Sequence, residues 1–201
     1  MLRIIAGELG GRRLRTPAGR LTRPTADRVR EALFNILGPP PEGAAVLDLY
    51  AGSGALGIES LSRGAAHATF VEQDAQVCRT IATNLRELGL AERATVLGRP
   101  VRPALGQLAA RAPAAPFQWI FADPPYANSG TSGELPWLLD LIGRSALLAP
   151  DGLLIVERAT RDADAFASAL AATPGLALHD RRRYGDTALL FLTATAHGEA
   201  S

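Results

Sequence analysis

Four consecutive residues, Asp123-Pro124-Pro125-Tyr126, carry the chemical groups needed to hold a planar amine. They directly follow the apolar run 117–122, which is typical of a short buried strand. The two prolines fix φ at about −65° and lack an N–H, so they cannot extend a sheet and they leave carbonyls available. We predict that Asp123 and the Pro124 carbonyl accept the two amine hydrogens, and that Tyr126 stacks on the base. A turn that merely ends the strand is the simpler alternative.

A second motif, Gly52-x-Gly54-x-x-Gly57, follows the apolar run 45–50 and opens a helical stretch. This context gives the glycine pattern its value, because backbone without side chains can approach a ligand closely. Glu72 ends the next apolar run, about 20 residues beyond the first glycine, where an acid bonds ribose hydroxyls. The pattern therefore predicts a ribose-containing cofactor, which NAD and S-adenosylmethionine both satisfy.

Asp48 favours S-adenosylmethionine over NAD. It lies within the strand before the glycines, where an acid would repel a pyrophosphate but could anchor the ammonium of an amino acid moiety. The alternative for Asp48 is an acid that braces the loop. The predicted cofactor-binding residues are Asp48, Tyr50, Ala51, Gly52, Ser53, Gly54, Gly57, Glu72 and Gln73.

Short apolar runs that alternate with helical stretches must position these motifs. They predict strands over 45–50, 68–71, 95–97, 118–122 and 153–156, which is the βαβ pattern of a largely parallel, doubly wound sheet. The runs 176–183 and 187–193 are joined by only three residues, so they predict a terminal antiparallel hairpin. This hairpin does not belong to the usual dinucleotide-binding sheet. The predicted fold is α/β, with seven strands in a mostly parallel Rossmann-like sheet.

The first 43 residues differ from the rest and are predicted to form a small extension. Runs 2–6 and 12–16 predict two short strands, and Thr25 can cap a helix whose apolar face holds Val29, Leu33, Ile36 and Leu37. The prolines of 39–41 stop this helix. We therefore place domain boundaries at 1–43, 44–193 and a frayed tail, 194–201.

Positive charge is concentrated in residues 1–30, which hold eight of the 21 basic residues, all arginine, and only two acids. A solvated basic arm is the simplest interpretation. Because the arginines are interleaved with structured-looking sequence, we instead predict a surface that contacts RNA phosphates. The predicted RNA-binding residues are Arg12, Arg13, Arg15, Arg20, Arg23, Arg28 and Arg30.

Composition limits the remaining possibilities. A chain of 201 residues with 47% hydrophobic residues can form one substantial globular domain. It has no apolar stretch long enough for a bilayer and no signal peptide, which predicts a cytoplasmic protein without membrane contact. Cys78 is the single cysteine and the three histidines are far apart, so no metal site is expected. The sequence does not fix the oligomeric state, although we favour a monomer.

Taken together, these segments resemble the RsmD family of 16S rRNA guanine-N2 methyltransferases. The resemblance rests on Arg3-Ile4-Ile5-Ala6-Gly7, on the segments 23–31 (RPTADRVRE) and 48–57 (DLYAGSGALG), on 123–126 (DPPY), and on the link 183–187 (RYGDT). Segment 23–31 is the most specific of these, because many class I methyltransferases share the cofactor and amine motifs. The chain departs from the usual pattern at Gly98-Arg99-Pro100-Val101, where methyltransferases often place a polar residue at the adenine edge.

The resemblance implies transfer of a methyl group from S-adenosylmethionine to a guanine N2 in the P-site hairpin loop of the 30S head. Asp123 would orient the amine, and its action as a general base stays open. Methylation of adenine N6 or cytosine N4 in DNA, or of a protein glutamine, is the rival within enzymes. An inactive RNA-binding assembly factor and an NAD-dependent dehydrogenase are further alternatives. Either free 16S rRNA or an assembled 30S particle could be the partner.

Overall fold

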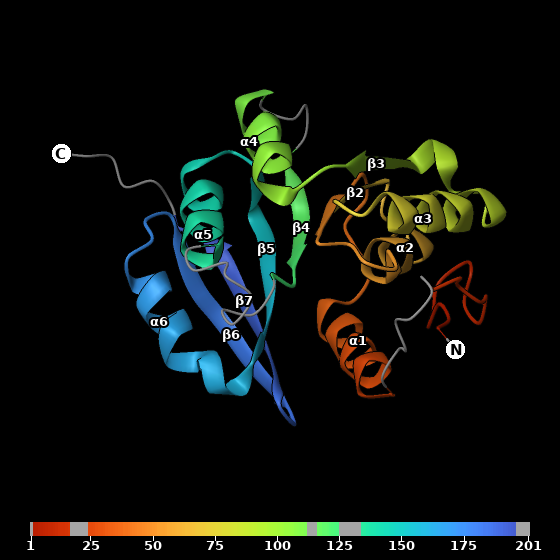
Figure 1. Cartoon of the computed structure of the whole chain (residues 1–201). Helices are drawn as coiled ribbons and strands as arrows, with labels where there is room; N and C mark the ends of the chain where they lie inside the picture. Colours follow the sequence, from red (N-terminus) through yellow and green to blue (C-terminus); the bar gives the residue numbers. More distant parts are fainter. Residues whose placement is uncertain (1, 17–23, 112–115, 125–133, 196–201) are drawn as a thin grey trace. The chain divides into compact units, whose positions relative to one another are not determined.

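The computed structural model describes residues 2–16, 24–111, 116–124 and 134–195 (Figure 1). The chain divides into two compact units, Met1–Ala104 and Leu105–Ser201. The first unit therefore contains the basic arm together with the glycine-rich loop. The domain boundary near residue 43 stays a prediction.

The first unit contains three parallel strands in the order β3-β2-β1, with helices between them. Strand β1 pairs in register with β2 from Ala45↔His67, and β2 pairs with β3 from Ala68↔Ala94. The strand predictions are confirmed to within two residues at each end. The elements are α1 (Pro24–Leu37), β1 (Ala45–Leu49), α2 (Ala55–Ser62), β2 (His67–Glu72), α3 (Ala75–Glu87), a 3-10 turn (Ala91–Arg93), β3 (Ala94–Gly98) and α4 (Val101–Arg111), which crosses the unit boundary.

The two strands expected in the arm are wrong in extent. The structure reduces them to a single antiparallel bridge, Arg3↔Arg13. Backbone hydrogen bonds on either side of it, from Ile4 N–H to the Arg12 carbonyl and from Leu14 N–H to the Leu2 carbonyl, keep the hairpin-like pairing. The arm is held instead by burial, because Leu2, Ile4 and Leu14 belong to the same apolar core as α2 and α3.

The buried face of α1 also differs from its prediction. Ile36 is 41% exposed, whereas Phe34 is fully buried beside Val29 and Leu33. The Phe34 ring lies beneath the guanidinium of Arg63, whose carbon is 4.9 Å from the ring centroid. The buried face of the helix is therefore centred on Phe34 and not on Ile36. The prediction from apolar periodicity did not include this aromatic ring.

The second unit contains four strands in the order β4-β5-β7-β6. β5 runs parallel to β4 and antiparallel to β7, which confirms the predicted terminal hairpin. Strand β5 is much longer than predicted, because it begins before the Asp151-Gly152 interruption. The elements are β4 (Phe117–Ala122), α5 (Glu134–Arg144), β5 (Leu148–Ala159), a 3-10 turn (Thr160–Asp162), α6 (Ala163–Ala171), β6 (Leu176–Tyr184) and β7 (Thr187–Ala194).

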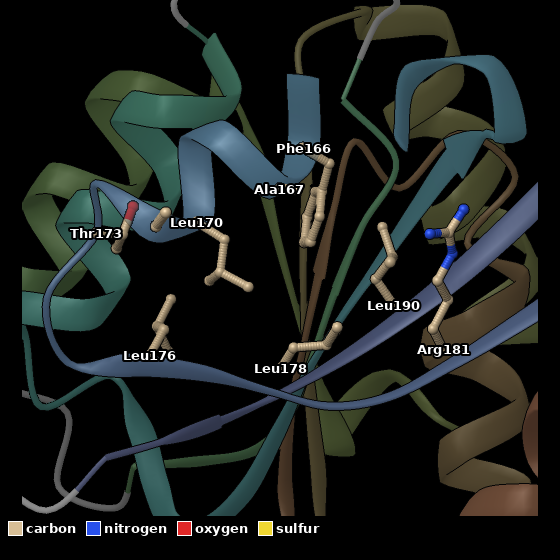
Figure 2. A pocket seen from close by; sticks show the side chains of 9 residues that line it. Phe166, Ala167, Leu170, Thr173, Leu176, Leu178, Arg181 and Leu190 are labelled. Atoms are coloured by element: carbon tan, nitrogen blue, oxygen red, sulfur yellow. The ribbon is translucent and has the colours of Figure 1, made fainter. Parts of the chain in front are cut away.

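Helix α6 and the hairpin β6–β7 enclose a mostly apolar hollow of about 440 Å³ (Figure 2). Its walls include Phe166, Leu170 and Leu190, and the exposed side chain of Leu178 lies at its edge. Among the described residues, none of those predicted to bind cofactor, amine or RNA lines it.

The part of the chain that the structure describes contains no helix that is both long and apolar enough to cross a bilayer. Within the same ranges, no three His, Cys, Asp or Glu side chains are grouped closely enough to hold a metal ion.

Candidate functional site

The glycine-rich loop begins where β1 ends and makes a tight turn into α2. Tyr50 has φ 57°, a left-handed conformation that is uncommon for a residue with a side chain, and Gly54 has φ 73° just before the helix. Ala51 N–H bonds the Val71 carbonyl at 3.0 Å, and Gly54 N–H bonds the Ala51 carbonyl at 2.8 Å. The loop is thus fixed by its own backbone and by β2.

Glu72 fixes the loop from the end of β2. Its Oε2 accepts a hydrogen bond from Gly52 N–H at 3.0 Å, and its Oε1 accepts one from Asp74 N–H at 2.9 Å. The residue is only 8% exposed. Since each carboxylate oxygen can accept more than one hydrogen bond, Glu72 keeps capacity for ribose hydroxyls while it holds the glycine loop. These residues therefore fit the predicted nucleoside.

Asp48 braces the start of α2, which is the alternative that the sequence left open. It is 2% exposed, and its Oδ2 accepts a hydrogen bond from Gly57 N–H at 3.0 Å. Gly57 is required for packing, because a Cβ there would lie 2.3 Å from the Phe70 ring. Contact of Asp48 with a cofactor ammonium stays a prediction.

The remaining predicted cofactor residues lie around this loop. Ala51 is buried, Ser53 is half-buried, and Gln73 is exposed directly after β2. At the departure from the family pattern, Val101 is buried at the start of α4. Cys78 is half-buried, and its Sγ donates to the Glu72 carbonyl at 3.3 Å. Burial and the nearby acids raise the pKa of this thiol, which makes it a poor nucleophile.

The predicted amine site lies in the second unit, at the end of β4. Asp123 is exposed and Pro124 is buried, whereas Pro125 and Tyr126 lie outside the described residues. Arg158 of β5 donates from Nη1 to the Pro124 carbonyl at 3.1 Å. The same guanidinium donates from Nη2 to Asp162 at 3.3 Å, and the side chain is almost fully buried. The carbonyl predicted to receive the amine is therefore held in place, and its second lone pair stays available.

Sequence reasoning missed both Arg158 and its neighbour Glu157. Glu157 is half-buried, and burial together with the charge of Asp123 raises the pKa of its carboxyl to about 7. A signal was present in the sequence, because the apolar run 153–156 ends in Glu-Arg as the run 117–122 ends in Asp-Pro. Parallel neighbours that end in polar residues place those residues at the same edge of a sheet.

The predicted RNA-binding arginines divide into four groups. Arg13 and Arg28 are exposed. Arg15 makes a two-pronged contact with Glu87, at 2.6 and 3.0 Å, and Arg12 reaches the Glu87 carbonyl at 3.3 Å. Arg20 and Arg23 lie outside the described ranges.

Arg30 differs from all of these because it is only 5% exposed. Its Nη2 donates to the Arg3 carbonyl at 2.6 Å and to Asp27 at 3.3 Å. Burial lowers the pKa of this guanidinium. In this structure Arg30 fixes the Arg3 backbone to α1 and offers no surface to a phosphate.

Polar side chains of α2 and α3 also fix the arm, and the sequence did not reveal them. Glu59 is 1% exposed and accepts hydrogen bonds from Ile5 N–H at 2.7 Å and Ala6 N–H at 3.0 Å. Asn84 both accepts from and donates to the Arg15 backbone, at 2.9 and 3.0 Å. An acid and an amide at core positions of helices were the available signal, because buried polar groups need partners.

Comparison with known proteins gives consistent results. A model of the family described as Conserved hypothetical protein 95 matches residues 2–193. Ribosomal RNA small subunit methyltransferase D of Escherichia coli (strain K12) is 40% identical over 156 residues, which cover 78% of this chain and 74% of that protein.

Two solved structures share the fold. The structure of yhhF from Escherichia coli is 34% identical and superposes with a TM-score of 0.78, covering 97% of this chain and 98% of that one. SMU.776, whose structure holds SAH, is 14% identical with a TM-score of 0.67, over 85% of this chain and 50% of that one. The second likeness concerns the fold alone. The predicted Rossmann-like class I methyltransferase fold is confirmed.

Proposed function

The chain belongs to the RsmD family, and we propose that it transfers a methyl group from S-adenosylmethionine to the N2 amine of one guanine in 16S rRNA. Dependence on S-adenosylmethionine and action on rRNA follow from the family. The choice of guanine N2, and of the P-site hairpin loop in the 30S head, is the finer part of the proposal. The observation that carries it is the end of β4, where Asp123 is exposed and Arg158 holds the Pro124 carbonyl.

The glycine loop and Glu72 would hold the cofactor. Glu72 would accept ribose hydroxyls while it keeps Gly52 in place, and Asp48 would keep the start of α2 fixed through Gly57. S-adenosylmethionine supplies a methyl group that is already activated by its sulfonium. The protein therefore needs mainly to position the acceptor, and a loop that is fixed before binding avoids the cost of ordering it.

Asp123 and the Pro124 carbonyl would accept hydrogen bonds from the two N–H groups of the guanine amine. The amine lone pair is delocalised into the ring, so these two bonds would turn it toward the methyl group. Positive charge develops on nitrogen during transfer, and the Asp123 carboxylate stabilises it. The proton then leaves to Asp123 or to water. Arg158 supports this step by fixing the carbonyl.

The arm would bind rRNA phosphates through exposed arginines, chiefly Arg13 and Arg28. A shallow polar hollow of about 540 Å³ is lined by Arg15, Arg79 and three threonines. Arg15 remains a candidate, since phosphate could compete for the exposed pair that it forms with Glu87. Arg30 is left out of this surface because it is buried.

The test is incubation with labelled S-adenosylmethionine and, in separate reactions, free 16S rRNA, 30S subunits, DNA and ribosomal protein. We expect N2-methylguanosine in one RNA substrate when the product nucleosides are identified by mass spectrometry. N6-methyladenine or N4-methylcytosine in DNA, or methylglutamine in protein, would replace the proposal with its rival. Labelled product in none of the four would leave the inactive assembly factor.

A further inference from the structure

Glu157 lies beside Asp123 at the carboxyl ends of two neighbouring parallel strands. The last pair in the register of β4 and β5 is Ala122↔Val156. The next residues of the two chains in the same register are Asp123 and Glu157. The influence of the Asp123 charge on Glu157 is consistent with this placement. Two carboxyl groups therefore share the edge where we place the target amine.

The surroundings of Glu157 provide no donor within the described residues. It forms no hydrogen bond or ion pair there, although it is half-buried. The neighbouring Arg158 is directed to Pro124 and Asp162. On the other side, β7 pairs Glu157 with Leu189, which is apolar, and the nearest charged residue of β6, Arg182, bonds Asp180. Among the described residues, Asp123 is the one charged group that the structure places against it.

A partly buried acid for which the described residues supply no donor is costly, and it is typical of a position completed by a ligand. The Watson–Crick edge of guanine has two neighbouring donors, the N2 amine and the ring N1–H. Adenine and cytosine instead place a ring acceptor beside their amine. An ionised carboxylate only accepts hydrogen bonds, so it suits the guanine edge and opposes the other two.

We propose that Glu157 is a specificity-determining residue that accepts a hydrogen bond from guanine N1–H while Asp123 accepts one from the N2 amine. This inference rests on the proposed function and extends it from the amine to the identity of the base. Loss of the N1–H bond would leave Glu157 without a donor in the complex, which penalises bases that lack N1–H.

The test compares two acceptors in reconstituted 30S subunits: guanine at the methylated position, and 2-aminopurine, which keeps the N2 amine but lacks N1–H. For the unaltered enzyme we expect kcat/KM to be at least about tenfold higher with guanine. In Glu157→Gln this preference should shrink several-fold, because an amide can also donate to N1 of 2-aminopurine. Asp151→Asn is the control, an exposed acid on the same strand.

The pH dependence of the unaltered enzyme gives a second readout that needs no variant. With guanine, kcat/KM should fall as the pH drops through about 7, because protonation removes the charge that strengthens the bond from N1–H and turns one Glu157 oxygen into a donor. With 2-aminopurine this fall should be absent or reversed. An unchanged guanine preference in Glu157→Gln, or the same pH profile for both acceptors, would overturn the inference. If the unaltered enzyme does not methylate guanine at all, the proposed function fails instead.

Discussion

Each unit has two acids near the carboxyl ends of its parallel strands, and the two pairs differ in burial and in hydrogen bonding. Asp48 and Glu72 of the first unit are buried and accept hydrogen bonds from loop backbone. At the ends of β4 and β5, Asp123 is exposed and Glu157 has no donor within the described chain. The first pair holds the loop through backbone hydrogen bonds. In the proposed function the second pair would accept hydrogen bonds from the substrate.

Asp123→Ala should have the largest effect, because it removes an acceptor used during transfer. We expect the rate of methyl transfer to fall by about 100- to 1,000-fold. Cofactor affinity, measured by calorimetry, should stay within about twofold, since Asp123 is not among the predicted cofactor-binding residues. Asp151→Asn should leave both quantities unchanged. Undiminished turnover in Asp123→Ala would break the contrast between the two pairs of acids.

Gly57→Ala tests whether the cofactor loop is set by packing. The added methyl group would lie 2.3 Å from the Phe70 ring, so α2 or the ring must move, at a cost of about 1 to 3 kcal/mol in unfolding free energy. We also expect weaker cofactor binding, since the bond from Gly57 to Asp48 shifts with the helix. Urea unfolding and calorimetry would measure the two effects.

Gly106→Ala is the matched control, because this helical glycine of α4 has open space around its Cβ position. It should be neutral or slightly stabilising. The double variant Gly57→Ala with Phe70→Leu should recover part of the loss. Equal effects of Gly57→Ala and Gly106→Ala would mean that packing against Phe70 does not fix the loop.

Most of the fold was predictable because strands leave a simple mark in the sequence. Buried runs such as 45–50 and 117–122 are continuous, and the short link before Thr187 excludes a crossover helix. The glycine loop was predictable for the same local reason. Asp48 was harder, because an acid at that place can serve a ligand or a loop.

Long-range contacts were not predictable. The burial of Arg30 depends on the Arg3 carbonyl, and that of Glu59 depends on the arm's N–H groups, 53 and 54 residues away in sequence. Glu157 and Arg158 gained their roles only from the register of β5 against β4. Charged residues are mostly exposed, so a sequence gives no indication that one of them is buried and bonded to a distant part of the backbone.

Glu157→Gln should change how stability depends on pH. The unfolded chain releases this proton near pH 4.5, whereas the folded protein retains it up to about pH 7. Between these values the unfolding free energy falls by about 1.4 kcal/mol per pH unit, a loss of about 3 kcal/mol over the interval that the amide would not suffer.

Urea unfolding at pH 5 and pH 8 measures this difference. The variant should gain stability relative to the unaltered protein at pH 8 and lose that advantage at pH 5. Asp151→Asn supplies the control at both values. A pH-independent difference would show that the carboxylate is solvated, and would remove the contrast between Glu157 and the bonded acids of the first unit.

The same contrast divides the arginines of the arm, and here the expected effect is smallest. Arg13→Gln with Arg28→Gln should weaken RNA binding a few-fold and reduce the slope of log affinity against log salt by about one for each phosphate that is no longer neutralised. Arg30→Met should instead lower the unfolding free energy and leave the salt slope unchanged, because its guanidinium is bonded to the Arg3 carbonyl. Filter binding across a salt series, beside urea unfolding, separates the two classes. An unchanged slope in the Arg13/Arg28 pair would mean that the exposed arginines are merely solvated, and a reduced slope in Arg30→Met would return that residue to the RNA surface.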